Sequence, residues 1–326
     1  MSSQAKKVLV SWPEPIDLSV LHAAMPDAEF TFCPLDDPAI CEALPETEIW
    51  VAGGPPVSDE QLDAAKKLKW IQMFGAGLPP GVFQKRFRER GFLLSNAKGV
   101  NIDNMAEHAL MFILAFARGL PTLVRRQARH EWILQTHAPT LFELGTQTLG
   151  IVGYGAIGSA VARRARALGM KVWAVRRSPS DSDIGEVDRM LGREDLPELL
   201  ASVDHVLLSV PLTPDTEGMM GADQFALMKP TAYFHNIGRG KLVDQDALLA
   251  ALVDGRIAGA GLDVVTPEPL PADHPLWDAP NTLITGHLAG NTPEFFPRVM
   301  AYIAKNMRRY MAGEELAGRV DLSRGY

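Results

Sequence analysis

Short apolar runs alternate with amphipathic stretches along the first hundred residues. The apolar runs are rich in residues that favour strands, and they predict strands at residues 8–10, 30–32, 49–51, 70–74 and 92–94. The amphipathic stretches at residues 18–25 and 59–68 predict helices. Such alternation is typical of a parallel sheet that carries helices on both faces.

The same alternation resumes near residue 148, where it predicts strands at residues 149–152, 172–175, 206–210, 232–236, 258–262 and 282–284, and a last helix at residues 295–311. Between the two regions, residues 106–118 predict a helix that is apolar nearly all round, so it should be buried in a core or in a subunit interface. We therefore expect an α/β fold of two doubly wound parallel-sheet lobes. One lobe comprises residues 1–100 and 292–326, and the other, residues 101–291, is inserted into it.

A glycine-rich turn between a predicted strand and a predicted helix is the strongest motif. It consists of Gly153, Tyr154, Gly155, Ala156, Ile157 and Gly158, and this spacing in this context indicates dinucleotide binding. The first glycine permits a tight turn, the second lets the backbone approach a pyrophosphate, and the third lets helix and strand pack closely. The pyrophosphate would lie at the helix N-terminus, where free N–H groups favour an anion. A glycine-rich turn without a ligand is the plainer alternative.

The end of the next predicted strand bears on which dinucleotide is bound. An NAD-binding domain usually has an acidic residue there, which binds the ribose 2′-hydroxyl. This chain instead has Arg176, Arg177 and Ser178, and a guanidinium pairs well with a 2′-phosphate. The sequence therefore favours NADP over NAD, with two solvated arginines at a strand end as the alternative.

Composition narrows the class of protein further. The chain has 326 residues, of which 47% are hydrophobic and 22% charged, as in an ordinary globular protein of two domains. The net charge of −7, without a basic tract, argues against nucleic acid as a partner. The longest apolar run, at residues 109–117, is too short to span a membrane. Cys33 and Cys41 form no metal or disulfide pattern, so we expect a cytoplasmic protein without a metal ion.

Three polar residues that each follow a predicted strand form the candidate catalytic set. They are Arg239, Glu268 and His287. Histidine is the usual proton donor near neutral pH, a guanidinium can pair with a substrate carboxylate, and a carboxylate beside a histidine favours its imidazolium form. The plainer interpretations are a turn arginine, a solvated loop glutamate and a histidine at a sheet edge. His108, in the apolar helix, is interpreted as a core residue.

Taken in order, these motifs resemble the D-isomer-specific 2-hydroxyacid dehydrogenase family. Beside the glycine turn, the resemblance rests on Val210-Pro211-Leu212-Thr213, Asn236-Ile237-Gly238-Arg239-Gly240, Gly261-Leu262-Asp263-Val264 and Glu268-Pro269. It runs from about Gly75 to Gly290, covers most of the chain, and is similar to the NADP-using glyoxylate and hydroxypyruvate reductases. It implies a Rossmann dinucleotide-binding domain, residues 101–291, inserted in a flavodoxin-like substrate-binding domain.

The resemblance also implies a reaction, in which hydride from NADPH reduces a small 2-keto acid to a D-2-hydroxy acid. Arg239 would bind the substrate carboxylate and keto oxygen, His287 would be the general acid, and Glu268 would hold His287. Asp263 would bind the nicotinamide carboxamide. The substrate carboxylate would also lie on the backbone of Gly75, Ala76 and Gly77, and further cofactor positions would be Ala156, Ile157, Val210, Pro211, Thr216, Ile237 and Gly290. A homodimer formed through the region of residues 106–118 is implied as well.

Two departures from the family pattern and two rival functions stay open. Gly286 stands where the family often has proline before the catalytic histidine, and residues 78–80 read Leu-Pro-Pro where valine and aspartate are common. A nucleotide-sensing binding protein of the corepressor kind would keep the glycine turn without turnover. A formate dehydrogenase would have glutamine in place of Glu268, so the acid argues against that activity.

Overall fold

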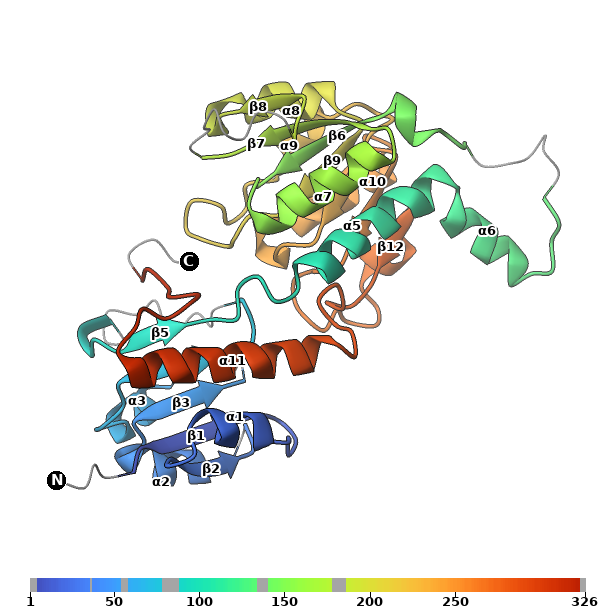
Figure 1. The fold of residues 1–326 in the computed structure, drawn as a ribbon. Helices are drawn as coiled ribbons and strands as arrows, with labels where there is room; N and C mark the ends of the chain where they lie inside the picture. Colours follow the sequence, from blue (N-terminus) through green and yellow to red (C-terminus); the bar gives the residue numbers. More distant parts are fainter. Residues whose placement is uncertain are drawn as a thin grey trace. The chain divides into compact units, whose positions relative to one another are not determined.

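The computed structural model describes residues 5–35, 37–53, 58–77, 88–133, 140–177 and 186–322. The chain divides into two compact units, a first unit of Met1–Val100 with Thr292–Tyr326 and a second unit of Asn101–Asn291 (Figure 1). Each unit contains one parallel sheet with helices, so the predicted fold class is confirmed.

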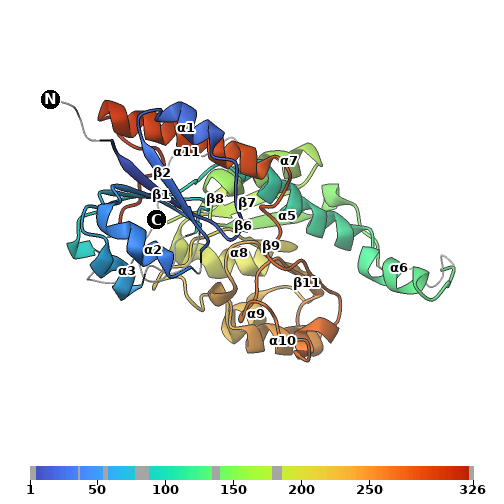
Figure 2. The same ribbon diagram turned by 90° about the horizontal axis from the view of Figure 1, so that it is seen from below.

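The first unit has a five-stranded sheet in the order β2-β1-β3-β4-β5. Its strands are β1 (Lys7–Ser11), β2 (Glu29–Cys33), β3 (Ile49–Ala52), β4 (Trp70–Met73) and β5 (Leu93–Ser95). Helices α1 (Ser19–Ala24) and α11 (Phe295–Ala312) lie side by side on one face (Figure 2), and α2 (Ala39–Ala43) and α3 (Asp59–Ala64) cover the other. This strand order is that of flavodoxin-like folds.

The second unit has a seven-stranded sheet in the order β12-β11-β10-β9-β6-β7-β8, which extends the Rossmann order by one strand. Its strands are β6 (Thr148–Val152), β7 (Lys171–Val175), β8 (Arg189–Leu191), β9 (His205–Leu208), β10 (Tyr233–Asn236), β11 (Gly259–Leu262) and β12 (Thr282–Ile284). Its helices are α5 (Ile102–Ala117), α6 (Leu120–Gln127), α7 (Ala156–Ala167), α8 (Leu196–Ser202), α9 (Ala222–Leu227) and α10 (Gln245–Val253).

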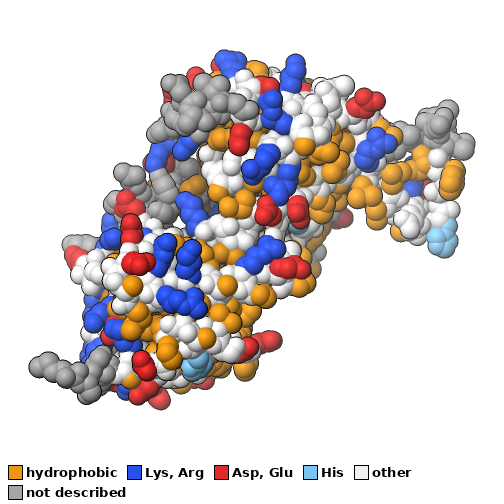
Figure 3. Space-filling model, in the orientation of Figure 1, with side chains coloured by type: hydrophobic (Ala, Val, Ile, Leu, Met, Phe, Trp, Pro, Cys, Tyr) orange, Lys and Arg blue, Asp and Glu red, His pale blue; other side chains and the backbone are white. Residues whose placement is uncertain are grey.

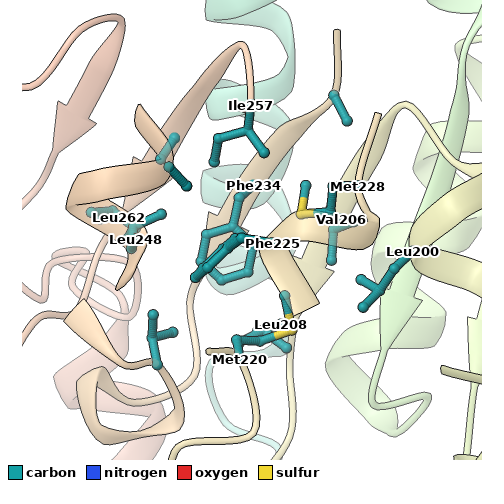
Figure 4. Packing of buried hydrophobic residues seen from close by; sticks show 14 of the residues in the cluster. Leu200, Val206, Leu208, Met220, Phe225, Met228, Phe234, Leu248, Ile257 and Leu262 are labelled. Carbon is teal, nitrogen blue, oxygen red and sulfur yellow. The ribbon is translucent and has the colours of Figure 1, made fainter. Parts of the chain in front are cut away.

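Alternate side chains of each central strand of this sheet enter cores on opposite faces. Along β9, Val206 and Leu208 pack towards α8, α9 and α10, whereas Leu207 packs towards α5 and α7. Figure 4 shows the first of these cores, where the rings of Phe225 and Phe234 meet edge to face with centroids 5.3 Å apart. Each fully buried side chain of this size contributes about 1.5–3 kcal/mol. The sheet is therefore a rigid platform for the loops at its edge.

The structure differs from the sequence predictions in its details, and the helix predicted at residues 59–68 ends at Ala64. Strand β8 was not predicted, because a three-residue edge strand has no room for an alternating pattern. The helix expected to be buried in a core or in a subunit interface is buried along part of its surface in the single chain, where Met111 and Leu114 are each 40% exposed. All the other predicted strands are present, within about two residues of their expected bounds.

No single helix among the described residues has the length and apolarity to cross a membrane, and only α5 and α6 counted together, across a 71° bend, would meet those criteria.

Candidate functional site

The candidate residues of the second unit all lie beyond the carboxyl ends of its strands. Because these strands are parallel, their carboxyl ends lie at one edge of the sheet. The glycine turn follows β6, Arg239 follows β10, Asp263 and Glu268 follow β11, and His287 follows β12. Doubly wound sheets bind their ligands at this edge, so the topology alone gathers residues that are far apart in the sequence.

The three glycines of the turn have three different surroundings. Gly153 has φ +106°, and a side chain there would meet the carbonyl of Ser209 at 2.6 Å. A Cβ on Gly158 would overlap the carbonyl oxygen of Gly153, so this glycine lets α7 pack against the turn. A Cβ on Gly155 would meet nothing within 4 Å. That open space lies at the N-terminus of α7, where no side chain caps the helix, so the turn fits a dinucleotide pyrophosphate.

These surroundings predict opposite effects for two alanine substitutions. Gly155→Ala should weaken dinucleotide binding about tenfold with little change in thermal stability, because its methyl group occupies only the open space. Gly158→Ala should lower the unfolding free energy by about 1–3 kcal/mol, because its methyl group overlaps backbone. Calorimetric titration with the dinucleotide and thermal unfolding measure both quantities. Unchanged binding in Gly155→Ala would place the pyrophosphate elsewhere.

The strand end expected to select the coenzyme is exposed. Arg176 and Arg177 are both exposed after β7, and the backbone N–H of Arg176 donates to the carbonyl of Leu191 at 3.0 Å. This bond fixes the path of the backbone where the arginine pair begins. Ser178 lies outside the described residues.

The remaining predicted cofactor positions surround the same edge. After β9, the hydroxyl of Thr216 donates to the carbonyl of Pro211 at 2.7 Å and accepts from the N–H of Thr213 at 2.8 Å, which holds the turn that begins at Val210. Ile237 is buried after β10. The carbonyl of Gly290 accepts a hydrogen bond from Asn104 at 3.1 Å.

Glu268 and His287 are in direct contact. Oε2 of Glu268 lies 2.7 Å from Nδ1 of His287, and its other oxygen, Oε1, accepts from the N–H of Val265 at 3.2 Å. The two side chains are 36% and 48% exposed. A carboxylate at this distance favours the Nδ1–H form of the imidazole, and no hydrogen bond between described residues uses Nε2 of His287. The arrangement leaves that nitrogen for proton transfer to a ligand.

Arg239 is held beside the segment that leads to Glu268. A Cβ on Gly240 would overlap the carbonyl group of Val265, so only glycine allows the two loops to approach this closely. Nη1 of Arg239 donates to the carbonyl of Gly238 at 2.6 Å. Burial lowers the pKa of the guanidinium and the Glu268 carboxylate opposes that shift, but an arginine stays charged in proteins. A fixed cation therefore lies near the acid–histidine pair.

Asp263 holds the loop that carries His287. Its side chain is 1% exposed, and it accepts hydrogen bonds from the hydroxyl of Thr285 at 2.7 Å and from the N–H groups of Leu288 at 2.8 Å and Ala289 at 3.1 Å. Its Oδ2 accepts only from Ala289 among the described residues, so it can take one more donor. Asp263 therefore anchors this loop and retains a free acceptor for a ligand.

The backbone explains the departure at position 286. Gly286 has φ +63° and His287 has φ +62°. Proline is fixed near −65°, so the residue that the family often has there would not fit this loop, whereas glycine adopts the left-handed region at little cost.

Sequence reasoning missed three residues that support this site, namely Gln245, His108 and Thr285. Gln245 accepts from the N–H of Thr266 at 2.8 Å and donates to its carbonyl at 2.6 Å, which holds the loop before Glu268. His108, interpreted as a core residue, places Nε2 at 2.8 Å from Oγ1 of Thr285. No motif marks any of them, because their partners lie in other parts of the sequence.

A second pair of histidines lies in the core instead. Nδ1 of His205 is 3.1 Å from Nε2 of His235, and both residues are fully buried. Burial lowers the pKa of His205 to about 4 and that of His235 as well. Both are therefore neutral near pH 7, which excludes them as proton donors to a ligand.

The first unit contains the loop expected to hold a substrate carboxylate. Gly75 and Ala76 are exposed after β4, and their carbonyls accept from the N–H of Ala97 at 3.1 Å and from Nδ2 of Asn96 at 2.8 Å. The N–H groups of Gly75, Ala76 and Gly77 donate to no described residue, so they suit an anion. Residues 78–80 lie outside the described part of the chain.

Comparison with known proteins identifies a family that matches part of the chain and several relatives of similar sequence. Residues 110–289 match the family described as D-isomer specific 2-hydroxyacid dehydrogenase, NAD binding domain. A glyoxylate reductase of Korarchaeum cryptofilum is 36% identical over 79% of this chain and 78% of its own length. A glycerate dehydrogenase of Methylorubrum extorquens is 33% identical over 95% of this chain and 97% of its own.

The solved structures resemble the chain over nearly its whole length. A D-isomer specific 2-hydroxyacid dehydrogenase from Xanthobacter autotrophicus, in complex with NADPH and MES, has a TM-score of 0.83 and 31% identity. The match covers 99% of this chain and 100% of the other.

Proposed function

Because the chain belongs to the D-isomer specific 2-hydroxyacid dehydrogenase family, we propose that it reduces a small 2-keto acid of the glyoxylate or hydroxypyruvate kind to a D-2-hydroxy acid, with NADPH as the preferred coenzyme. The observation that carries this proposal is the 2.7 Å contact between Glu268 and His287, at the sheet edge that also bears the glycine turn. The name of the Korarchaeum relative supports the substrate class, and the NADPH complex of the Xanthobacter structure supports the coenzyme.

The chain has the residues to hold such a coenzyme. We assign the pyrophosphate to the open space beside Gly155, the 2′-phosphate to Arg176, Arg177 and Ser178, and the nicotinamide carboxamide to the free acceptor of Asp263. The bound coenzyme supplies a hydride to the keto carbon.

The side chains of the site would then complete the reduction. His287, protonated, gives its Nε2 proton to the keto oxygen as negative charge develops there, which is general-acid catalysis. Glu268 keeps the ring oriented through Nδ1–H and stabilises the imidazolium. Arg239 orients the substrate through its carboxylate and keto oxygen. In the first unit, Gly75, Ala76 and Gly77 stay proposed as substrate-binding residues through their backbone N–H groups.

The experiment that tests the proposal is a screen of NADPH oxidation against glyoxylate, hydroxypyruvate and larger 2-keto acids. We expect turnover that depends on the keto acid and is fastest with the small ones. NADPH binding without turnover of any keto acid would instead support a nucleotide-sensing binding protein. Formate with NADP⁺ serves as the negative control, because Glu268 stands where a formate dehydrogenase has glutamine.

The pH dependence of the reaction tests the role of Glu268. Reduction needs a protonated His287, so activity should fall at alkaline pH. In Glu268→Gln a hydrogen bond to Nδ1 is still possible, but the charge that favours imidazolium is gone. The alkaline limb of the rate profile should therefore move to lower pH. The measurement is kcat against pH at saturating NADPH.

Arg239→Lys is the control for this pH experiment. Lysine keeps the charge but cannot reproduce a bidentate grip on a carboxylate, so KM should rise and kcat should fall while the alkaline limb stays in place. If the limb of Glu268→Gln does not move either, Glu268 is only a solvated loop carboxylate.

We also propose that a second copy of the chain covers the exposed apolar face of α5 and α6. Leu120, Leu123 and Val124 lie on one side of α6, with Val124 53% exposed, and Trp132 beyond it is 91% exposed. Figure 3 shows hydrophobic side chains gathered on this projecting arm. Apolar patches of this kind mark interfaces.

Light scattering should give twice the 35.6 kDa chain mass, and Val124→Asp should shift the protein towards monomer. A wild-type monomer at micromolar concentration would contradict the proposal. A cytoplasmic location stays a prediction from the sequence.

A further inference from the structure

Helix α5 approaches β11 unusually closely, and this brings His108 to the edge of the sheet. A Cβ on Gly261 would lie 2.5 Å from Cγ of Phe112, so glycine is required for the contact. His108 lies one helical turn before Phe112, and the two rings meet edge to face with centroids 5.0 Å apart. The imidazole of His108 thereby reaches the segment that follows β11, where Asp263 lies 3.5 Å away.

The donor and the acceptor can be assigned in each hydrogen bond that links His108 to Asp263. The hydroxyl of Thr285 lies 2.7 Å from Oδ1 of Asp263 and 2.8 Å from Nε2 of His108. An ionised carboxylate only accepts, so the hydroxyl donates to Asp263 and accepts from His108. The proton of the imidazole is therefore on Nε2. Burial lowers the pKa of His108, although Asp263 opposes that shift, which agrees with a neutral ring that has one N–H.

Asp263 holds the backbone at His287 and at the two residues that follow it. The N–H groups of Leu288 and Ala289 donate to its side chain, and the N–H of His287 donates to the carbonyl of Asp263 at 2.5 Å. Left-handed backbone at a residue other than glycine, as at His287, is disfavoured by the contact of Cβ with the carbonyl oxygen. Such a conformation persists only where its surroundings hold it. Here the hydrogen bonds that these residues donate to Asp263 hold it.

We propose that His108 is a positioning residue which, through the hydroxyl of Thr285, fixes the carboxylate of Asp263 and thereby the loop that presents His287. This inference rests on the proposed function for the role of His287, but the anchoring of the loop can be measured without turnover. His108 touches neither substrate nor the reacting atoms in this role. It acts only through Thr285 and Asp263.

The kinetic test compares variants that remove a hydrogen-bonding group with variants that keep one. His108→Leu and Thr285→Val each remove one link, and each should lower kcat about tenfold while KM for the keto acid changes less than twofold. The double variant should be no slower than the slower single variant, because both break the same chain of bonds. His108→Gln and Thr285→Ser keep a donor and a hydroxyl in place and should recover most of kcat. Multiplicative losses in the double variant would overturn the proposal.

Hydrogen exchange supplies the readout that does not depend on activity. The amides of Leu288 and Ala289 should exchange at least tenfold faster in His108→Leu and Thr285→Val than in the wild type, and at nearly wild-type rates in His108→Gln and Thr285→Ser. Unchanged exchange in the two loss variants overturns the inference even if the wild type reduces keto acids. Faster exchange in a protein that reduces no keto acid would support the anchoring and reject the proposed function instead. Thermal unfolding identifies any variant that is destabilised as a whole.

Discussion

Replacing His287 with alanine should lower kcat for keto-acid reduction at least 100-fold, while the affinity for NADPH changes little. General-acid catalysis is worth roughly 10²–10⁴ in rate, and in this chain its removal leaves the developing oxyanion near Arg239 without a proton source. Nδ1 is in contact with Glu268, and no hydrogen bond between described residues uses Nε2, so the loss should concern proton transfer and not coenzyme binding. Steady-state kinetics and titration of NADPH fluorescence measure the two quantities separately.

The control for this variant is His22→Ala. His22 lies on α1 in the first unit and packs against Phe30, so its loss should leave kcat unchanged. His287 has a left-handed backbone, which asparagine tolerates better than alanine does. His287→Asn is therefore the second test, and it should be as slow as His287→Ala. Near-normal turnover in both variants would mean that another group donates the proton.

The fold could be predicted from the sequence because its strands are short, apolar and separated by helical patterns. Strands such as β6 and β9 are buried on both faces, and buried parallel strands read as continuous hydrophobic runs. The edge strand β8 lacked that signal, since its first residue, Arg189, is exposed. Local pattern thus predicts central strands well and edge strands poorly.

The outline of the site was predictable for a different reason. Loops that follow parallel strands lie at one edge whatever their distance in sequence, so Glu268 and His287 could be expected near each other once β11 and β12 were recognised. The supports of these residues could not be predicted. His108 reads as a core residue of an apolar helix, and its contact with Thr285 depends on the close approach of α5 at Gly261, which no local pattern reveals.

Wild-type kcat/KM should be about 10- to 150-fold higher with NADPH than with NADH, and replacing both Arg176 and Arg177 with alanine should remove most of that preference. A charge-assisted hydrogen bond contributes roughly 1.5–3 kcal/mol, and NADH lacks the phosphate that would receive it. The double variant should therefore lose activity with NADPH and keep its activity with NADH, and its residual preference should depend less on salt.

The matched control removes two other exposed cations, Lys305 and Arg308 on α11, and should leave the ratio of the two coenzymes unchanged. This comparison separates loss of a phosphate site from a general change in net charge. The assignment of the arginine pair follows from its place at the end of β7, where an acid would otherwise bind the ribose hydroxyls. Equal kcat/KM with both coenzymes in the wild type would refute it, and would make Arg176 and Arg177 solvated residues at a strand end.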